Sequence, residues 1–307
     1  FTYAPRVNRV STGQEAMKLM LQKKFDLVIV MLRIEDQDPI SLAKSIKKLY
    51  PKKPIILLSF DESELKQLPK INKINSIDSV FIWSGDAGVF PAIIKYVEDR
   101  KNAKNDIEIG NVRSILLIED SPRDYSVLLP LIYKEIMYQI KNLIDSSLRQ
   151  SQRILHLRAR PKVFLTPNYN TAQRLFNRYQ KNMIGIISDV KFNRNGKQSS
   201  EAGIEFVKWV RKKDKSVPIL LHSTQGDNKI FAKKLEVSFL SKESPTLLNN
   251  LRDFIINNFG FGDFIFRLPN YDEVDRASNI AEFISRIHEI PDESLLFHAK
   301  NHHLSNW

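Results

Sequence analysis

The sequence predicts an α/β protein in which parallel strands alternate with helices that cover both faces of each sheet. Short apolar runs of strand length are followed by amphipathic stretches of helix length along most of the chain. The same order of runs occurs twice: 26–32 (DLVIVML) corresponds to 184–190 (IGIISDV), and 54–59 (PIILLS) corresponds to 218–223 (PILLHS). Because 307 residues exceed one ordinary hydrophobic core, an internal duplication into two doubly wound domains is the simplest explanation.

The first half of the chain contains three predicted strands, each short and apolar, as expected of strands buried on both faces. They span residues 26–32, 54–59 and 79–83. Helices are predicted at 14–24, 39–50 and 89–98. Residues 101–111 (KNAKNDIEIGN) are polar and end in a Gly-Asn pair, which predicts a linker.

The second half restarts the pattern with five predicted strands, at 114–118, 162–166, 184–188, 218–223 and 237–241. A long amphipathic helix follows the first of them, with apolar residues at helical spacing from Tyr125 to Leu148. Further helices are predicted at 171–180, 202–212 and 245–259. A strand-like run at 264–270 and two helices, one after Ser278 and one at Pro291, then form a helix-rich C-terminal tail.

The composition is that of a soluble globular protein, with 42% hydrophobic and 27% charged residues and no apolar run of membrane-spanning length. The absence of cysteine excludes disulfides, thiolate metal sites and cysteine nucleophiles, and it fits a cytoplasmic location. The net charge of +12 is spread along the chain, which favours a solvated basic surface. The chain does not begin with Met and stops at Trp307, so we expect a fragment of a larger protein.

Polar residues stand at the carboxyl ends of four strands in the second half. Glu119 and Asp120 follow the first strand, Asp189 ends the third, Ser223 ends the fourth and Lys242 follows the fifth. In an open parallel sheet such positions converge in one crevice. Three carboxylates there repel each other unless a hard cation such as Mg²⁺ joins them. A carboxylate can also attack phosphorus, and a hydroxyl and an ammonium can then stabilise the transferred charge.

Each of these residues also has a purely structural interpretation. Asp120 precedes Ser121-Pro122 and could only cap a helix. A single Ser223 at a strand end is uninformative, and Lys242 alone could be a solvated side chain. Their occurrence together, in the expected order at the expected strand ends, favours one shared site.

This pattern resembles the receiver domain of bacterial two-component response regulators over residues 112 to 258. The runs that carry the resemblance are ILLIEDSP, IISDV, PILLHS and FLSK. It implies a flavodoxin-like fold with a five-stranded parallel sheet in each half, and Asp189 as the phosphoacceptor. The resemblance also implies that Ser223 and Lys242 assist the transfer, and that Phe239 changes rotamer as Ser223 moves. The Mg²⁺ ligands it implies are Asp120, Asp189 and the backbone carbonyl of Lys191, with Glu119 acting mostly through water.

Three features depart from that family's pattern. Glu243 replaces the proline that usually follows the lysine, the loop after Asp189 (VKFNRNGKQSS) is long and basic, and the spacing from Asp120 to Asp189 is long. These departures concern partner choice and output geometry more than the chemistry.

The first half resembles a degenerate copy of the same domain. Met31 stands where the phosphoacceptor is expected, Ser59 at the hydroxyl position, and Ser84 at the lysine position. Methionine neither accepts a phosphoryl group nor suits Mg²⁺. We therefore predict a pseudo-receiver at 1–100, a linker at 101–111, a receiver at 112–260 and an extension at 261–307 that leads to an output domain.

The sequence thus favours a response-regulator module that is not itself an enzyme, phosphorylated by a histidine kinase or phosphotransfer protein. Stretches such as IIKYVEDR, RILHLRARPK and EAGIEFVKWVR also resemble the N-terminal regulatory region of phosphoenolpyruvate synthase-like proteins. The alternative is therefore the non-catalytic N-terminal region of such an enzyme. A DNA-binding regulator is a third hypothesis, motivated by charge alone, and no reading helix supports it. The long helix after Asp120 could mediate a homodimer, but packing between the two lobes of one chain is the favoured interpretation.

Overall fold

A computed structural model describes residues 5–66, 75–143, 160–278, 280–300 and 303–306. The chain forms two compact units, one made of residues 1–102 and 121–133, the other of 103–120 and 134–307. The predicted strands of both halves are present, with ends that differ by two residues or fewer. In the described part of the chain, no helix is long and apolar enough to cross a membrane.

The first unit contains a three-stranded parallel sheet in the order β1-β2-β3. The five-stranded sheet expected for this half is therefore wrong for the described residues. The physical reason is that residues 5–12 (PRVNRVST) are polar and offer no apolar run for a further strand. The elements of this unit are α1 (Gly13–Gln22), β1 (Val28–Met31), α2 (Pro39–Leu49), β2 (Ile55–Ser59), α3 (Glu62–Lys66) and β3 (Ser79–Ile82).

Local sequence explains where the first helices begin. Asp38 caps α2, its carboxylate accepting from the Ser41 N–H at 2.8 Å, and Pro39 fits the first turn because it needs no hydrogen-bond donor there. Thr12 caps α1 in the same way, through the Glu15 N–H at 3.1 Å. All five residues of β2 are buried, so this strand forms the centre of the unit's core.

Helix α4 (Val89–Glu108) extends through most of the stretch predicted to be a linker. Its last turns are polar on average, yet Ala103 and Ile107 are buried in the core of the second unit. The Gly110-Asn111 pair ends the helix: Asn111 has φ of 51°, and the Val112 N–H bonds the Asp106 carbonyl at 3.0 Å. Burial of Ala103 and Ile107 therefore favours a helix that continues to Glu108, although the neighbouring residues are polar.

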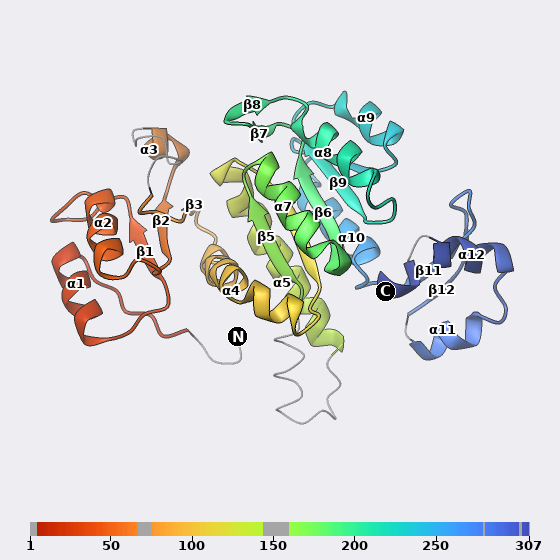
Figure 1. The fold of residues 1–307 in the computed structure, drawn as a ribbon, viewed down its shortest axis with the longest axis horizontal. Coiled ribbons are helices and arrows are strands. Elements are labelled where there is room, and N and C mark those ends of the chain that lie inside the picture. Colours follow the sequence, from red (N-terminus) through yellow and green to blue (C-terminus); the bar gives the residue numbers. More distant parts are fainter. Residues whose placement is uncertain (1–4, 67–74, 144–159, 279, 301–302, 307) are drawn as a thin grey trace. The chain divides into compact units, whose positions relative to one another are not determined.

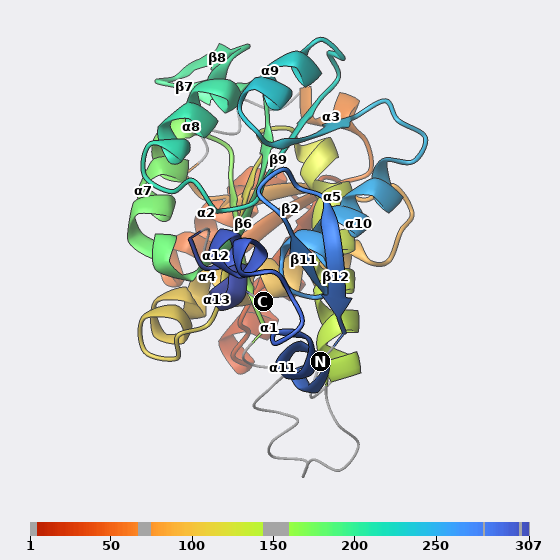
Figure 2. The same cartoon turned by 90° about the vertical axis from the view of Figure 1, so that its right-hand side faces the viewer.

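The second unit contains a five-stranded, wholly parallel sheet in the order β10-β9-β6-β4-β5, the order of a flavodoxin-like fold. Its strands are β4 (Ser114–Ile118), β5 (Lys162–Thr166), β6 (Met183–Asp189), β9 (Ile219–Ser223) and β10 (Ser238–Ser241). Helices α7 (Tyr169–Tyr179) and α8 (Ala202–Arg211) cover one face, and α10 (Leu247–Asn258) covers the other (Figures 1 and 2). The smaller helices η2 (Gln180–Asn182) and α9 (Asn228–Lys234) connect strands.

Helix α5 (Pro122–Leu143) contributes to both units. In the first unit, the Ser126 hydroxyl accepts from the Ile82 N–H at 2.9 Å, and the Tyr133 hydroxyl donates to Asp99 at 2.9 Å. In the second, Glu135 forms an ion pair of 3.0 Å with Arg252 of α10. The predicted helix to Leu148 continues into residues 144–159, which lie outside the described part of the chain.

The C-terminal segment, predicted to be helix-rich, also contains a small antiparallel sheet. Its strands are β11 (Phe264–Arg267) and β12 (Glu273–Ala277), and its helices are α11 (Ile280–Arg286), α12 (Asp292–Lys300) and α13 (His303–Asn306). Phe264, Phe266, Ala277 and Ile290 form its core. The strand β12 was missed because its sequence, EVDRA, alternates weakly and is mostly exposed.

Gly203 brings the start of α8 against the strand that carries Asp189. Its N–H donates to the Val190 carbonyl at 2.9 Å, and a Cβ here would lie 2.3 Å from the Asp189 carbonyl oxygen and 2.8 Å from the Val190 Cα. Since backbone atoms cannot yield as a flexible side chain can, Gly203→Ala should destabilise the protein by about 1–3 kcal/mol in urea unfolding. Gly226→Ala, where a Cβ meets nothing within 4 Å, is the matched control. Equal stability of the two variants would contradict the close packing of α8 on β6.

Candidate functional site

The carboxyl ends of β4, β6, β9 and β10 form one edge of the second sheet. β6 lies between β4 and β9, and β9 also pairs with β10, so the residues that end these strands are brought side by side. Glu119 and Asp120 follow β4, Asp189 and Ser223 end β6 and β9, and Lys242 follows β10. The sequence-predicted residues therefore occupy neighbouring positions at one edge.

Three carboxylates converge at this edge. Glu119, Asp120 and Asp189 each offer one oxygen, and these oxygens all lie within 4.8 Å of one another. Glu119 is fully buried and Asp189 is 7% exposed, whereas Asp120 is half-buried. Burial, together with the neighbouring charge of Asp189, raises the pKa of Asp120 to about 6. The cluster is thus electrostatically strained, and its oxygen ligands suit a hard divalent cation.

Lys242 neutralises part of this charge. Its ammonium donates to Glu119 Oε2 at 2.8 Å and to Asp189 Oδ2 at 2.8 Å. Its backbone N–H donates to the Ser223 carbonyl at 2.8 Å, which continues the β9–β10 ladder and fixes the origin of the side chain. The lysine therefore bridges the two most buried carboxylates.

Asp189 is oriented by its own backbone as well as by Lys242. Its Oδ1 accepts from the Val190 N–H at 2.6 Å and the Lys191 N–H at 3.3 Å, while Oδ2 faces the ammonium. The carboxylate is thus held in one orientation at the end of β6. The predicted role of the Lys191 carbonyl as a metal ligand stays a prediction.

Ser223 is buried at the end of β9 beside this cluster. Its hydroxyl oxygen accepts from the Gln225 N–H at 3.1 Å and from the Asn228 side-chain amide at 2.9 Å. These bonds tie it to the start of α9 and leave its own O–H to be donated elsewhere. Among the described residues, no hydrogen bond joins Ser223 to Asp189.

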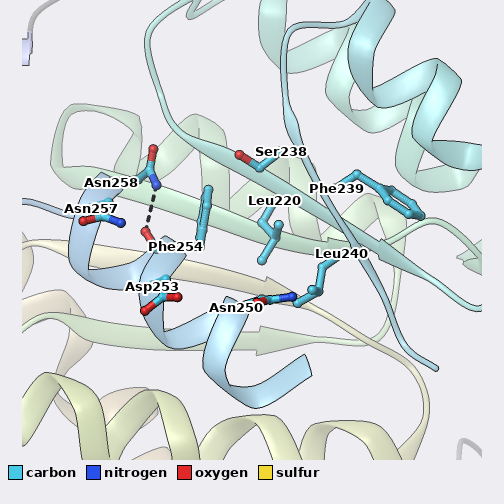
Figure 3. A pocket seen from close by; sticks show the side chains of 9 residues that line it. All are labelled: Leu220, Ser238, Phe239, Leu240, Asn250, Asp253, Phe254, Asn257 and Asn258. Atoms are coloured by element: carbon cyan, nitrogen blue, oxygen red, sulfur yellow. Dashed lines mark hydrogen bonds between the residues drawn. The ribbon is translucent and has the colours of Figure 1, made fainter. Parts of the chain in front are cut away.

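Phe239 lies on the edge strand β10, partly buried against the cluster formed by α7, α8 and the sheet. A shallow pocket of about 300 Å³ lies between β10 and α10, and Phe239 lines it together with Leu220, Leu240, Phe254 and neighbouring polar residues. Figure 3 shows the Phe239 ring turned away from Phe254 and Asn250 of α10. None of the three carboxylates lines this pocket.

His222 is a residue of this edge that the sequence interpretation missed. It lies opposite Asp189 in the β6–β9 register, is 2% exposed, and places its Nε2 3.7 Å from Glu119 Oε2. Burial, with the Lys242 charge nearby, lowers the pKa of His222 well below its usual range. The sequence offered one indication of its importance, because His222 directly follows the apolar residues PILL of a predicted buried strand.

The basic loop after Asp189 is an ordered hairpin of β7 (Phe192–Arg194) and β8 (Lys197–Ser199). Asn195 and Gly196, at φ of 51° and 82°, form its turn. Arg194 stacks on the Tyr169 ring and pairs with Glu205 of α8, which fastens the hairpin to the helices beside the site. The sequence predicted a loop here because the strands are short and polar.

Among the residues that the structure describes, the corresponding edge of the first unit holds no such cluster. β1 ends at Met31, and the Ser59 hydroxyl at the end of β2 bonds the Asp61 carbonyl at 2.7 Å and Glu64 at 2.8 Å. Ser84 is exposed. Within the described ranges, the carboxylates of the second unit are the one group of three that could hold a metal ion.

No protein-family model matches the chain. No curated protein matches it either. Among solved structures, a response regulator receiver domain protein from Clostridium thermocellum is 16% identical, with 48% of this chain and 95% of that chain covered and a TM-score of 0.36. The phosphorylated cyanobacterial phytochrome response regulator RcpA is 14% identical, with 48% and 94% covered and a TM-score of 0.33.

The Mn(2+)-bound form of response regulator Rcp1 is 16% identical, with 47% of this chain and 92% of that chain covered and a TM-score of 0.30. These structural neighbours are response regulator receiver domains. At such low identities and TM-scores the likeness carries no argument about function, which has to follow from the site itself.

The raised pKa of Asp120 makes the metal-free protein less stable as pH rises. The folded chain holds this proton up to about pH 6, whereas the unfolded chain releases it near 3.8, so stability falls as pH rises through that window. Asp120→Asn should remove the loss and gain about 1 kcal/mol at pH 7, a value reduced for partial exposure. Urea unfolding in EDTA at pH 4.5 and 7 measures the difference. Asp227→Asn, at an exposed position, is the control, and no gain at pH 7 would refute the prediction.

Proposed function

We propose that the second unit is a receiver module of a two-component response regulator, in which Asp189 accepts a phosphoryl group in a reaction that depends on a divalent cation. The observation that carries the proposal is the bridged cluster: three carboxylate oxygens within 4.8 Å, with Lys242 donating to Asp189 and Glu119 at 2.8 Å each. One carboxylate would be enough to form a structural ion pair with Lys242. The presence of three carboxylates is explained if a divalent cation binds between them.

The residues present fit such a cation, because they offer oxygen ligands, and burial together with the charge of Asp189 already raises the pKa of Asp120. Asp120, Asp189 and the Lys191 carbonyl would bind it directly, with Glu119 behind them through water. We favour Mg²⁺. When bound, it would neutralise charge on the oxygens of the phosphoryl group.

In the transfer, a carboxylate oxygen of Asp189 forms the new bond to phosphorus, and the bond from phosphorus to the donor's leaving group breaks with its electron pair. With acetyl phosphate the leaving group is acetate; with a phosphohistidine it is the imidazole of a kinase or phosphotransfer protein. Lys242 and the Ser223 hydroxyl would donate to the phosphoryl oxygens. The fixed orientation of Asp189, held by the Val190 and Lys191 N–H groups, reduces the entropy lost in reaching this geometry.

The expected consequence is a switch in the surface around β10. Ser223 would leave its bonds to Gln225 and Asn228 to reach the phosphoryl group, and Phe239 would change rotamer with it. This change would control an attached output domain. The first unit would act as a pseudo-receiver with a structural or docking role, since Met31 replaces the acceptor.

Phosphoryl acceptance is tested by intact mass after incubation with acetyl phosphate and Mg²⁺. The wild type should gain the mass of one phosphoryl group, and Asp189→Asn should gain none, because an amide oxygen is a poor nucleophile. Asp227→Asn, which removes an exposed carboxylate of the same unit, should behave as the wild type does. Equal incorporation in the wild type and Asp189→Asn would remove Asp189 as the acceptor.

Cation binding is tested separately, without a phosphodonor. Mg²⁺ or Mn²⁺ should raise the melting temperature, because a ligand that binds only the folded chain stabilises it by an amount that grows with the logarithm of its free concentration over its dissociation constant. In Asp120→Asn the increase should be lost or at least tenfold more metal should be needed, about 1.4 kcal/mol of binding free energy. An unchanged metal titration in this variant would contradict the proposed ligand set.

A further inference from the structure

His222 has a buried imidazole nitrogen that lacks a hydrogen bond. The residue is 2% exposed, and within the described part of the chain Nε2 has no hydrogen-bond partner. Buried polar atoms are seldom left in this condition, and each exception needs an explanation. The nearest acidic atom is Glu119 Oε2, at 3.7 Å, which is beyond a hydrogen bond but within reach of a small side-chain movement.

Two potential donors flank the same carboxylate oxygen. Glu119 Oε2 accepts from Lys242 at 2.8 Å and faces the His222 Nε2 at 3.7 Å. The backbone of His222 is fixed to the acceptor strand, because the Val190 N–H donates to its carbonyl at 3.2 Å and it lies opposite Asp189 in the register. A shift of about 0.8 Å would bring Nε2 to an ordinary hydrogen-bond distance from the carboxylate.

We propose that His222 is a positioning residue. When Lys242 turns from Glu119 to a phosphoryl group on Asp189, the His222 imidazole replaces the ammonium as the hydrogen-bond donor to Glu119, and we call this exchange the hand-over. The inference rests on the proposed function and concerns how the same site is regulated. Lys242 already contacts Asp189, so a phosphoryl group there would draw its donors away from Glu119. Glu119, fully buried, would then lose a charge-assisted hydrogen bond. The imidazole, with its proton on Nε2, donates in place of the ammonium.

This hand-over gives the unbonded His222 nitrogen a function. Glu119 Oε2 accepts from Lys242 in the structure, and it would become available to His222 once Lys242 turned to a phosphoryl group. If His222 only filled space, an apolar residue of similar volume would serve equally well, and the two explanations therefore predict different variants.

The test compares His222→Leu, which keeps the bulk and removes the donor, with His222→Gln, which keeps an N–H donor. With acetyl phosphate and Mg²⁺, His222→Leu should be phosphorylated at least about tenfold more slowly than the wild type, as expected for losing a hydrogen bond to a buried charge. Its Mg²⁺ affinity without phosphodonor should change by no more than about twofold, because Lys242 still holds Glu119. His222→Gln should recover most of the rate.

A second measurement uses the wild type and does not depend on how the variants fold. With ¹⁵N-labelled histidine, the His222 Nε2 proton should become protected from solvent exchange after phosphorylation in Mg²⁺ and acetyl phosphate, and not with Mg²⁺ alone. No new protection, equal rates for His222→Leu and the wild type, or equal defects in both variants would overturn the hand-over. A wild type that accepts no phosphoryl group would instead overturn the proposed function, and the hand-over with it.

Discussion

The bridge that Lys242 makes between Glu119 and Asp189 is the interaction on which the second unit's carboxyl edge depends. Both carboxylates are almost wholly withdrawn from water and lie side by side, and the ammonium between them offsets their mutual repulsion. Breaking such a buried pair typically costs about 3–5 kcal/mol, because the remaining charge is left without compensation. The lysine therefore holds the acidic cluster together without a metal. It also keeps Asp189 in a single orientation. The carboxylate that takes part in this stabilising ion pair is therefore also the candidate reactive group.

The parallel sheet is what makes this bridge attainable. Lys242 and Glu119 are 123 residues apart in the chain, and they meet because β10, β9, β6 and β4 end at one edge. Gly203 lets α8 approach the end of β6, and the β7–β8 hairpin is fastened to α7 and α8 beside it. The surroundings of Asp189 are thus built from backbone packing and short polar contacts, with little freedom to rearrange apart from the side chains at the strand ends.

The sequence was most informative where periodicity and position determine structure. The strands of the second sheet were predicted to within two residues, and Glu119, Asp120, Asp189, Ser223 and Lys242 were placed at its edge, because buried parallel strands are continuous apolar runs. Contacts between side chains distant in sequence could not be predicted. The approach of His222 to Glu119 depends on strand register, and the helical nature of 101–108 depends on burial of Ala103 and Ile107. The three strands of the first sheet were predicted from their apolar runs, whereas the five-stranded sheet expected there came only from the resemblance to the second half.

The shared use of α4 and α5 bears on how this protein can be divided. A cut after Asn111, at the end of the polar stretch, would remove Ala103 and Ile107 from the core of the second unit. It would also separate residues 121–133 from β3 and α4. The hydrogen bonds from the Ile82 N–H to Ser126 and from Tyr133 to Asp99 join these parts. Because each unit is made of two separate chain segments, no single cleavage of the chain releases either unit intact. Exchanging the second unit for another domain would therefore have to preserve the contacts that α4 and α5 make in the first unit.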